Sequence, residues 1–231
     1  MPKKLLGKMA VDLAMTVLLL LLMAYSLIGE AAHEWLGAGM LLLFILHHVL
    51  NFGWIKNIGK GRYTAVRVLQ TALAVLVLAA TLGSMLSGIA MSRYVFDFLP
   101  IEGGLSLARA VHLPCAYWGF VFMSLHLGLH WNMVMGIVRR MRKRQASKKQ
   151  RIVLRIAVVV IALYGIVAFL QNDIFSYLFL RTHFVFFDYE QPLILFFADY
   201  LAMMGLFILI AHSIGNSLFK SGGQRRKEES N

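Results

Sequence analysis

The chain has 231 residues, of which 59% are hydrophobic and only 15% are charged, and its mean hydropathy is +0.70. A soluble globule of this size carries more charge on its surface, so the composition excludes that class and indicates an integral membrane protein. The formal net charge of +12 lies mostly beside apolar runs, without a nucleic-acid-binding motif, which favours anionic lipid headgroups over nucleic acid as its counterpart. The single cysteine, Cys115, excludes an internal disulfide and a cysteine framework for zinc or an iron–sulfur cluster.

Six apolar runs are long enough to cross a hydrocarbon layer of ~30 Å as helices. In chain order they cover residues 11–29, 31–54, 66–91, 107–138, 152–171 and 193–217. None of these runs shows the alternation of apolar and polar residues that is typical of a membrane barrel strand. We therefore expect an all-α membrane protein with six transmembrane helices. The first run also resembles a secretory signal, but it is longer than the usual apolar core of one, and we expect it to be a retained span.

The basic residues predict the orientation of the chain in the membrane. All but three of the 23 lie in the N-terminus, the second and fourth connections and the C-terminal tail. These are Lys3, Lys4, Lys8, Lys56, Lys60, Arg62, Arg67, Arg139, Arg140, Arg142, Lys143, Arg144, Lys148, Lys149, Arg151, Arg155, Lys220, Arg225, Arg226 and Lys227. By the positive-inside rule this side is cytoplasmic, so both termini are expected inside, and the second and fourth helices run parallel.

The basic segment 139–151 divides the sequence. We expect a four-helix unit over residues 1–138, a cytoplasmic linker over 139–151 and a two-helix extension over 152–231. The connection 172–192 within the extension is rich in aromatic residues, namely Phe175, Tyr177, Phe179, Phe184, Phe186, Phe187 and Tyr189. Aromatic rings concentrate at the lipid–water boundary, so this connection is predicted to form a short interfacial helix or a lid over the outer end of the bundle.

Four histidines inside the predicted spans are the main functional signal. His33 and His47 are fourteen residues apart on the second span, and His112 and His126 are fourteen apart on the fourth. On an α-helix this interval rises ~21 Å and stops about 40° short of whole turns, so both histidines face roughly the same way at two depths. Two parallel helices would thus form an outer pair, His33 with His112, and an inner pair, His47 with His126. Because two neutral imidazoles can be the axial ligands of one haem iron, we predict two non-covalent b-type haems.

Two neighbouring histidines leave alternatives open. His48 is turned about 60° past the face of His33, which favours His47 as the inner ligand. His130 lies one turn beyond His126 on the same face, so it could replace His126 or line a cytoplasmic quinone or proton site. Small residues near the ligands are expected either to leave room for flat macrocycles or to allow close helix packing. They are Gly37, Gly39, Gly83, Ser84, Gly88 and Gly119.

The remaining intramembrane polar residues have more ordinary interpretations. We expect His183 at the surface of the outer connection and His212 as a hydrogen-bonded histidine within the bundle. Asp12 and Asp199 are candidates for proton relays, although a hydrogen-bonded structural role is the favoured interpretation of each.

The ligand pattern resembles the di-haem cytochrome b of cytochrome bc complexes. The segments His33-Glu34-x-x-Gly37, His47-His48-x-x-Asn51, His112 and His126-x-x-x-His130-Trp131 more closely resemble the flavinylation-associated cytochrome family, formerly described as a domain of unknown function. This resemblance covers about residues 13–131. The stretch Phe186-Phe187-Asp188-Tyr189 resembles an extension of anaerobic members.

The resemblance implies an electron conduit in a prokaryotic cytoplasmic membrane, as the electron-transfer component of an oxidoreductase system. It would connect a quinol or a cytoplasmic donor with extracytoplasmic flavin-bearing partners. The chain itself carries no evident Ser/Thr flavinylation motif, so the flavin is expected on a partner protein.

Two other function classes remain as alternatives. A membrane quinol or ferric-ion reductase would bind its own substrate, for example in a quinone pocket near His130 or among the outer aromatics. A metal-ion transporter would gather its histidines at one depth beside carboxylates, whereas the histidines here occupy two levels among apolar neighbours.

Overall fold

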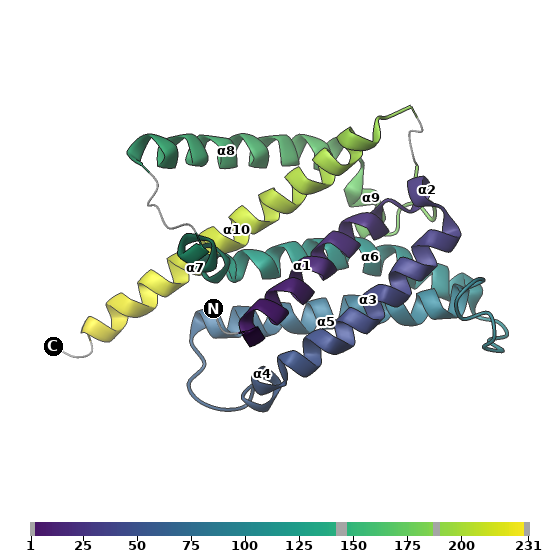
Figure 1. The fold of residues 1–231 in the computed structure, drawn as a ribbon, viewed down its shortest axis with the longest axis horizontal. Helices are drawn as coiled ribbons and strands as arrows, with labels where there is room; N and C mark the ends of the chain where they lie inside the picture. The colour runs from purple at the N-terminus through teal and green to yellow at the C-terminus, as the bar shows by residue number, and fades with distance from the viewer. Residues whose placement is uncertain (1–2, 142–146, 187–189, 229–231) are drawn as a thin grey trace. The chain divides into compact units, whose positions relative to one another are not determined.

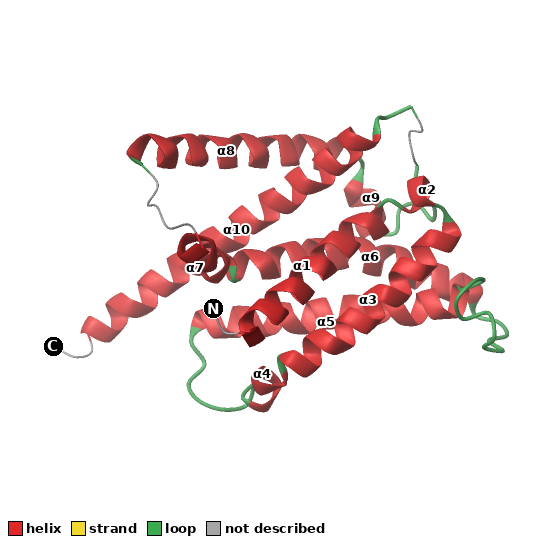
Figure 2. Cartoon of the chain, in the orientation of Figure 1, coloured by secondary structure: helices red, strands yellow, loops and turns green. Residues whose placement is uncertain are grey.

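The computed structural model describes residues 3–141, 147–186 and 190–228, and most of these residues are helical (Figure 2). No strand occurs within these ranges, which confirms the predicted all-α class. The helices in chain order (Figure 1) are α1 (Lys3–Met23), α2 (Tyr25–Ile28), α3 (Glu30–Leu50), α4 (Phe52–Lys56), α5 (Ala65–Met91), α6 (Leu105–Leu129), α7 (Trp131–Met141), α8 (Lys148–Gln171), α9 (Ile174–Leu178) and α10 (Leu193–Glu228).

Six of these helices, α1, α3, α5, α6, α8 and α10, are long and apolar enough to cross a membrane, as predicted. Large apolar side chains on their surfaces are exposed, for example Leu42 on α3 at 69% and Leu170 on α8 at 70%. An apolar helix surface of this kind is stable when lipid tails surround it. The chain is therefore a multi-pass membrane protein.

Three of the predicted spans end before the apolar runs that suggested them. The first run divides into α1 and α2, and the second ends at Leu50, where the short helix α4 follows. The prediction of one helix over 107–138 is wrong, because α6 ends at Leu129 and a separate amphipathic helix, α7, begins at Trp131. Apolar residues lie on both sides of each break, so hydropathy averaged over a window does not locate the turn.

The described chain forms two compact units. Unit 1 consists of Met1–Gly61, Ala80–Tyr117 and Ser176–Phe197, and unit 2 of Arg62–Ala79, Trp118–Phe175 and Ala198–Asn231. The predicted division at the basic segment stays a prediction, and residues 142–146 of that segment lie outside the described residues.

Unit 1 brings α1, α3 and parts of α5 and α6 together. Helix α1 packs along α3. Helices α5 and α6 approach closely at Gly83, where an added Cβ would lie 2.5 Å from the Cys115 sulfur atom. Most of the connection 172–192 also belongs to this unit. It contains the short helix α9, whose buried Tyr177 stacks on Tyr117 of α6 with ring centres 4.7 Å apart. Residues 187–189 of that connection lie outside the described residues.

Unit 2 is held together by contacts between small residues. Ala162, Gly165 and Ala168 form a buried stripe on α8, and a Cβ on Gly165 would clash with the Ala202 carbonyl of α10. On α6, a Cβ on Gly128 would lie 2.5 Å from the Ile208 carbonyl oxygen. Close backbone approach at small residues is how helices associate in lipid, where the hydrophobic effect does not drive them together.

Candidate functional site

The outer pair predicted from the sequence meets within unit 1. The ring centres of His33 on α3 and His112 on α6 are 6.1 Å apart, with 71° between the ring planes. In a bis-imidazole site each nitrogen lies ~2.0 Å from the metal and ~1.1 Å from its own ring centre, so the two centres are about 6 Å apart. The observed spacing is therefore the one that two imidazoles on opposite sides of one iron would have.

Helix α5 fixes the orientation and tautomer of His112. Its Nδ1 lies 3.0 Å from the Ser84 carbonyl oxygen and 3.0 Å from the Ser87 hydroxyl, and that hydroxyl donates to the Gly83 carbonyl at 2.6 Å. With two acceptors facing it, Nδ1 carries the ring proton. Nε2 therefore keeps its lone pair, which is the state that a histidine needs in order to bind a metal.

His33 is positioned by the turn between α2 and α3. The Tyr25 ring lies edge-on to it, with centres 5.1 Å apart and planes at 88°. This contact depends on Gly29, which has a φ of +79° and joins the two helices in a conformation that side chains rarely adopt. Nδ1 of His33 is buried and has no hydrogen-bond partner of good geometry in the described part of the chain.

The glycines near this pair divide into two kinds. A Cβ on Gly88 would lie 3.3 Å from Cε1 of His112, which is closer than most such contacts, so the missing side chain lets α5 pack tightly against the ring. A Cβ on Gly37, one turn from His33, would meet nothing within 4 Å, so open space lies beside α3 at this point. Gly39 makes an ordinary contact with Leu18, and the role of Gly119 stays a prediction.

Glu34 connects α3, the helix that contains His33, with the end of α5. Its carboxylate accepts a hydrogen bond from the Ser92 hydroxyl at 2.6 Å, and it accepts from the backbone N–H groups of Arg93, Tyr94 and Val95 at 2.8, 2.9 and 3.1 Å. Because α5 orients His112, this carboxylate fixes the spacing of the outer pair. No local pattern in the sequence predicts this role, since the partners lie about sixty residues away along the chain.

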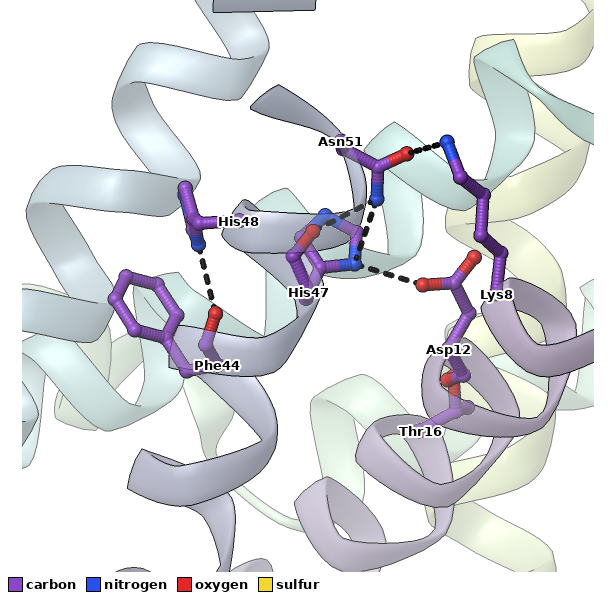
Figure 3. A network of polar contacts seen from close by, with 7 residues as sticks. All are labelled: Lys8, Asp12, Thr16, Phe44, His47, His48 and Asn51. Atoms are coloured by element: carbon purple, nitrogen blue, oxygen red, sulfur yellow. Dashed lines mark hydrogen bonds and ion pairs between the residues drawn. The ribbon is translucent and has the colours of Figure 1, made fainter. Parts of the chain in front are cut away.

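His47 of the predicted inner pair has a carboxylate partner on α1. Its Nδ1 lies 2.7 Å from Oδ1 of Asp12. Asn51 donates to the His47 carbonyl at 3.0 Å and accepts from the Lys8 ammonium at 2.9 Å, so four polar side chains form one network (Figure 3). A carboxylate that accepts from one ring nitrogen leaves the other nitrogen free to bind a metal and raises its basicity.

His48 points to a different side of α3, toward Phe44 (Figure 3). Its Nδ1 bonds the Phe44 carbonyl at 2.9 Å, so its Nε2 is also unprotonated, but no carboxylate supports it. In unit 2, the rings of His126 and His130 are 4.8 Å apart, and His130 occupies the break between α6 and α7. His47 and His126 belong to different units, and their pairing stays a prediction.

The other polar residues behave largely as expected. His183 is exposed, and Nε2 of His212 lies 3.0 Å from the Asn216 amide. Asp199 is buried and accepts from the Tyr164 hydroxyl at 2.5 Å and the Asn172 amide at 3.1 Å. These contacts agree with a structural role for Asp199.

No group of three or more His, Cys, Asp or Glu side chains that could hold a metal ion occurs in the described parts of the chain. Comparison of the chain with protein-family models, with curated proteins and with solved structures gave no match.

Proposed function

We propose that this protein is a di-haem b-type cytochrome that transfers electrons across the cytoplasmic membrane of a prokaryote. The observation that carries the proposal is the pairing of His33 with His112 at the spacing of a bis-imidazole site, with Nε2 of His112 left free by Ser84 and Ser87. Haem iron supplies a reversible one-electron change between its ferric and ferrous states when it is bound between such ligands.

The residues of the outer site each have a defined task. His33 and His112 would hold the haem iron through their imidazoles. Ser84 and Ser87 hold the proton on Nδ1 of His112, and Gly88 allows α5 to approach the ring. At the inner site, His47 and His126 are the proposed ligands, and Asp12 orients His47 as the serines orient His112.

The two sites would lie at different depths, since the ligands of each helix are separated by ~21 Å along its axis. The basic residues support an orientation with both termini in the cytoplasm. A quinol or a cytoplasmic donor would reduce one site, and an extracytoplasmic flavin-bearing protein would be the redox partner at the other side. The protein would thus be the membrane component of an oxidoreductase system.

Proteoliposomes test this function directly. Purified protein is reconstituted into vesicles that contain ferricyanide, dithionite is added outside, and loss of ferricyanide colour is followed. Wild-type vesicles are expected to react well above the rate of empty vesicles. His33→Ala and His47→Ala vesicles should react at the empty rate, whereas exposed His183→Ala should behave as wild type. Haem-loaded wild-type protein that reacts no faster than empty vesicles would exclude a transmembrane conduit.

A further inference from the structure

A half-open cavity of about 240 Å³ lies within unit 2. Helices α5, α6, α7 and α10 line it, and the residues that matter for its chemistry are Gln70, Leu129, Asn132, His212, Asn216 and Phe219. None of the residues that line it is an Asp, Glu, Lys or Arg. The cavity therefore suits a neutral ligand with polar atoms better than an anion such as a phospholipid headgroup.

A chain of hydrogen bonds runs along one wall of the cavity. The Asn132 amide donates to the Asn216 side-chain oxygen at 2.8 Å, and the Asn216 amide lies 3.0 Å from Nε2 of His212. Since Nε2 accepts from this amide, the ring proton is on Nδ1 and His212 is also a donor. Together with Gln70, the wall thus offers N–H donors and amide oxygen acceptors without a fixed charge.

The position of the cavity favours ligands that are dissolved in the membrane. It lies where α5 begins, where α6 ends at Leu129, and near the end of the apolar part of α10, which extends to Ser221. This is one end of three candidate membrane spans. Leu129 and the exposed ring of Phe219 give it an apolar edge. A polar headgroup can enter here while an apolar tail stays in the lipid.

We propose that this cavity binds the headgroup of a membrane quinone. Quinone carbonyls accept hydrogen bonds and quinol hydroxyls donate them, and amide and imidazole side chains serve both forms. The cavity is smaller than the ~300–1,000 Å³ pockets that enclose whole drug-sized ligands, which fits a ring system whose tail leaves through the open side. The inference deepens the proposed function, because it assigns the quinone-binding residues of the electron conduit.

Isothermal titration with decylubiquinone and with 2,3-dimethyl-1,4-naphthoquinone, on the full chain in nanodiscs, tests the proposal. We expect binding to weaken at least tenfold in His212→Phe and Asn216→Leu. Asn132→Leu should also weaken it, and this exposed side chain can be changed without disturbing the packing of the unit. The matched control is Ser213→Ala, whose exposed hydroxyl only bonds the Leu209 carbonyl of its own helix.

A His33→Ala/His112→Ala double variant separates this proposal from the proposed function. Quinone binding by that variant, combined with its loss in Asn132→Leu, supports the cavity whether or not the chain binds haem. If folded Asn132→Leu, Asn216→Leu and His212→Phe all bind both quinones as wild type does, the proposal is overturned. It is also overturned if phosphatidylglycerol, and neither quinone, binds in a manner that depends on these residues.

Discussion

The Ser87 hydroxyl oxygen lies 3.0 Å from Nδ1 of His112, and its own proton is donated to the Gly83 carbonyl. Ser87 thus accepts from the ring, as the Ser84 carbonyl does. An acceptor of this kind makes the imidazole a better electron donor to a metal, which stabilises the ferric state over the ferrous state.

Ser87→Ala is therefore expected to raise the midpoint potential of the outer haem. One hydrogen bond contributes ~1 kcal/mol, which corresponds to a rise of up to roughly 40 mV for one electron. Both haems should remain bound, because the Ser84 carbonyl still accepts from His112. Redox titration followed by visible spectroscopy measures the change, with Ser213→Ala as the control. An unchanged or lower potential would contradict the role given to this hydroxyl.

Gly88→Val is expected to displace the His112 ring and to remove the outer haem. The Cβ alone would lie 3.3 Å from Cε1 of His112, and the two methyl groups of valine need more space than the packed helices provide. Gly136→Val in α7 is the matched control, because a Cβ there meets nothing within 4 Å. Haem content, measured by the pyridine haemochrome method, is expected to fall in Gly88→Val and to stay unchanged in Gly136→Val. Full occupancy in Gly88→Val would show that α5 does not constrain this ring.

Glu34→Gln is expected to destabilise the fold around the outer pair. A carboxylate that accepts from four donors is replaced by an amide whose NH₂ group faces those donors, at a cost of roughly 1–2 kcal/mol. The melting temperature should fall, and hydrogen exchange at residues 92–95 should quicken. The exposed Glu102, changed to Gln, should leave both unchanged. Equal effects of the two substitutions would argue against this role of Glu34.

The sequence predicts the spans well and the partners of the histidines poorly. Continuous apolar composition locates six membrane helices, and the sequence predicts a pair of His33 and His112, whose ring centres are 6.1 Å apart in the structure. Both signals come from residues that are close in the sequence. The contacts that orient the histidines join residues far apart in the sequence, because Ser84, Glu34 and Asp12 contact partners 28 to 61 residues away.

The sequence also does not locate the ends of the helices. No proline or polar segment marks the break at His130, whose N–H is shared between the His126 and Leu127 carbonyls. Pro114, by contrast, lies inside α6, where it does not end the helix. In a membrane protein the usual stop signals are therefore weak guides, because tertiary packing decides where the backbone turns.

Asp12→Asn distinguishes His47 from His48 as the inner ligand. Asp12 contacts Nδ1 of His47, whereas His48 bonds the Phe44 carbonyl instead. With His47 as ligand, loss of the carboxylate should raise the midpoint potential of the inner haem by tens of millivolts, since charge-assisted bonds are worth ~1.5–3 kcal/mol before solvent weakens them. Asp97→Asn in the exposed loop between α5 and α6 is the control. An inner potential that does not move in Asp12→Asn would favour His48.

The central claim is that His33 and His112 hold one of two haems, and haem stoichiometry tests it most directly. Reduced-minus-oxidised spectra and haem quantitation on purified protein should give two b-type haems per wild-type chain and one in His33→Ala and in His112→Ala. His183→Ala should retain two. Wild-type protein without haem bands after expression with ample haem, or two haems in both ligand variants, would contradict the account.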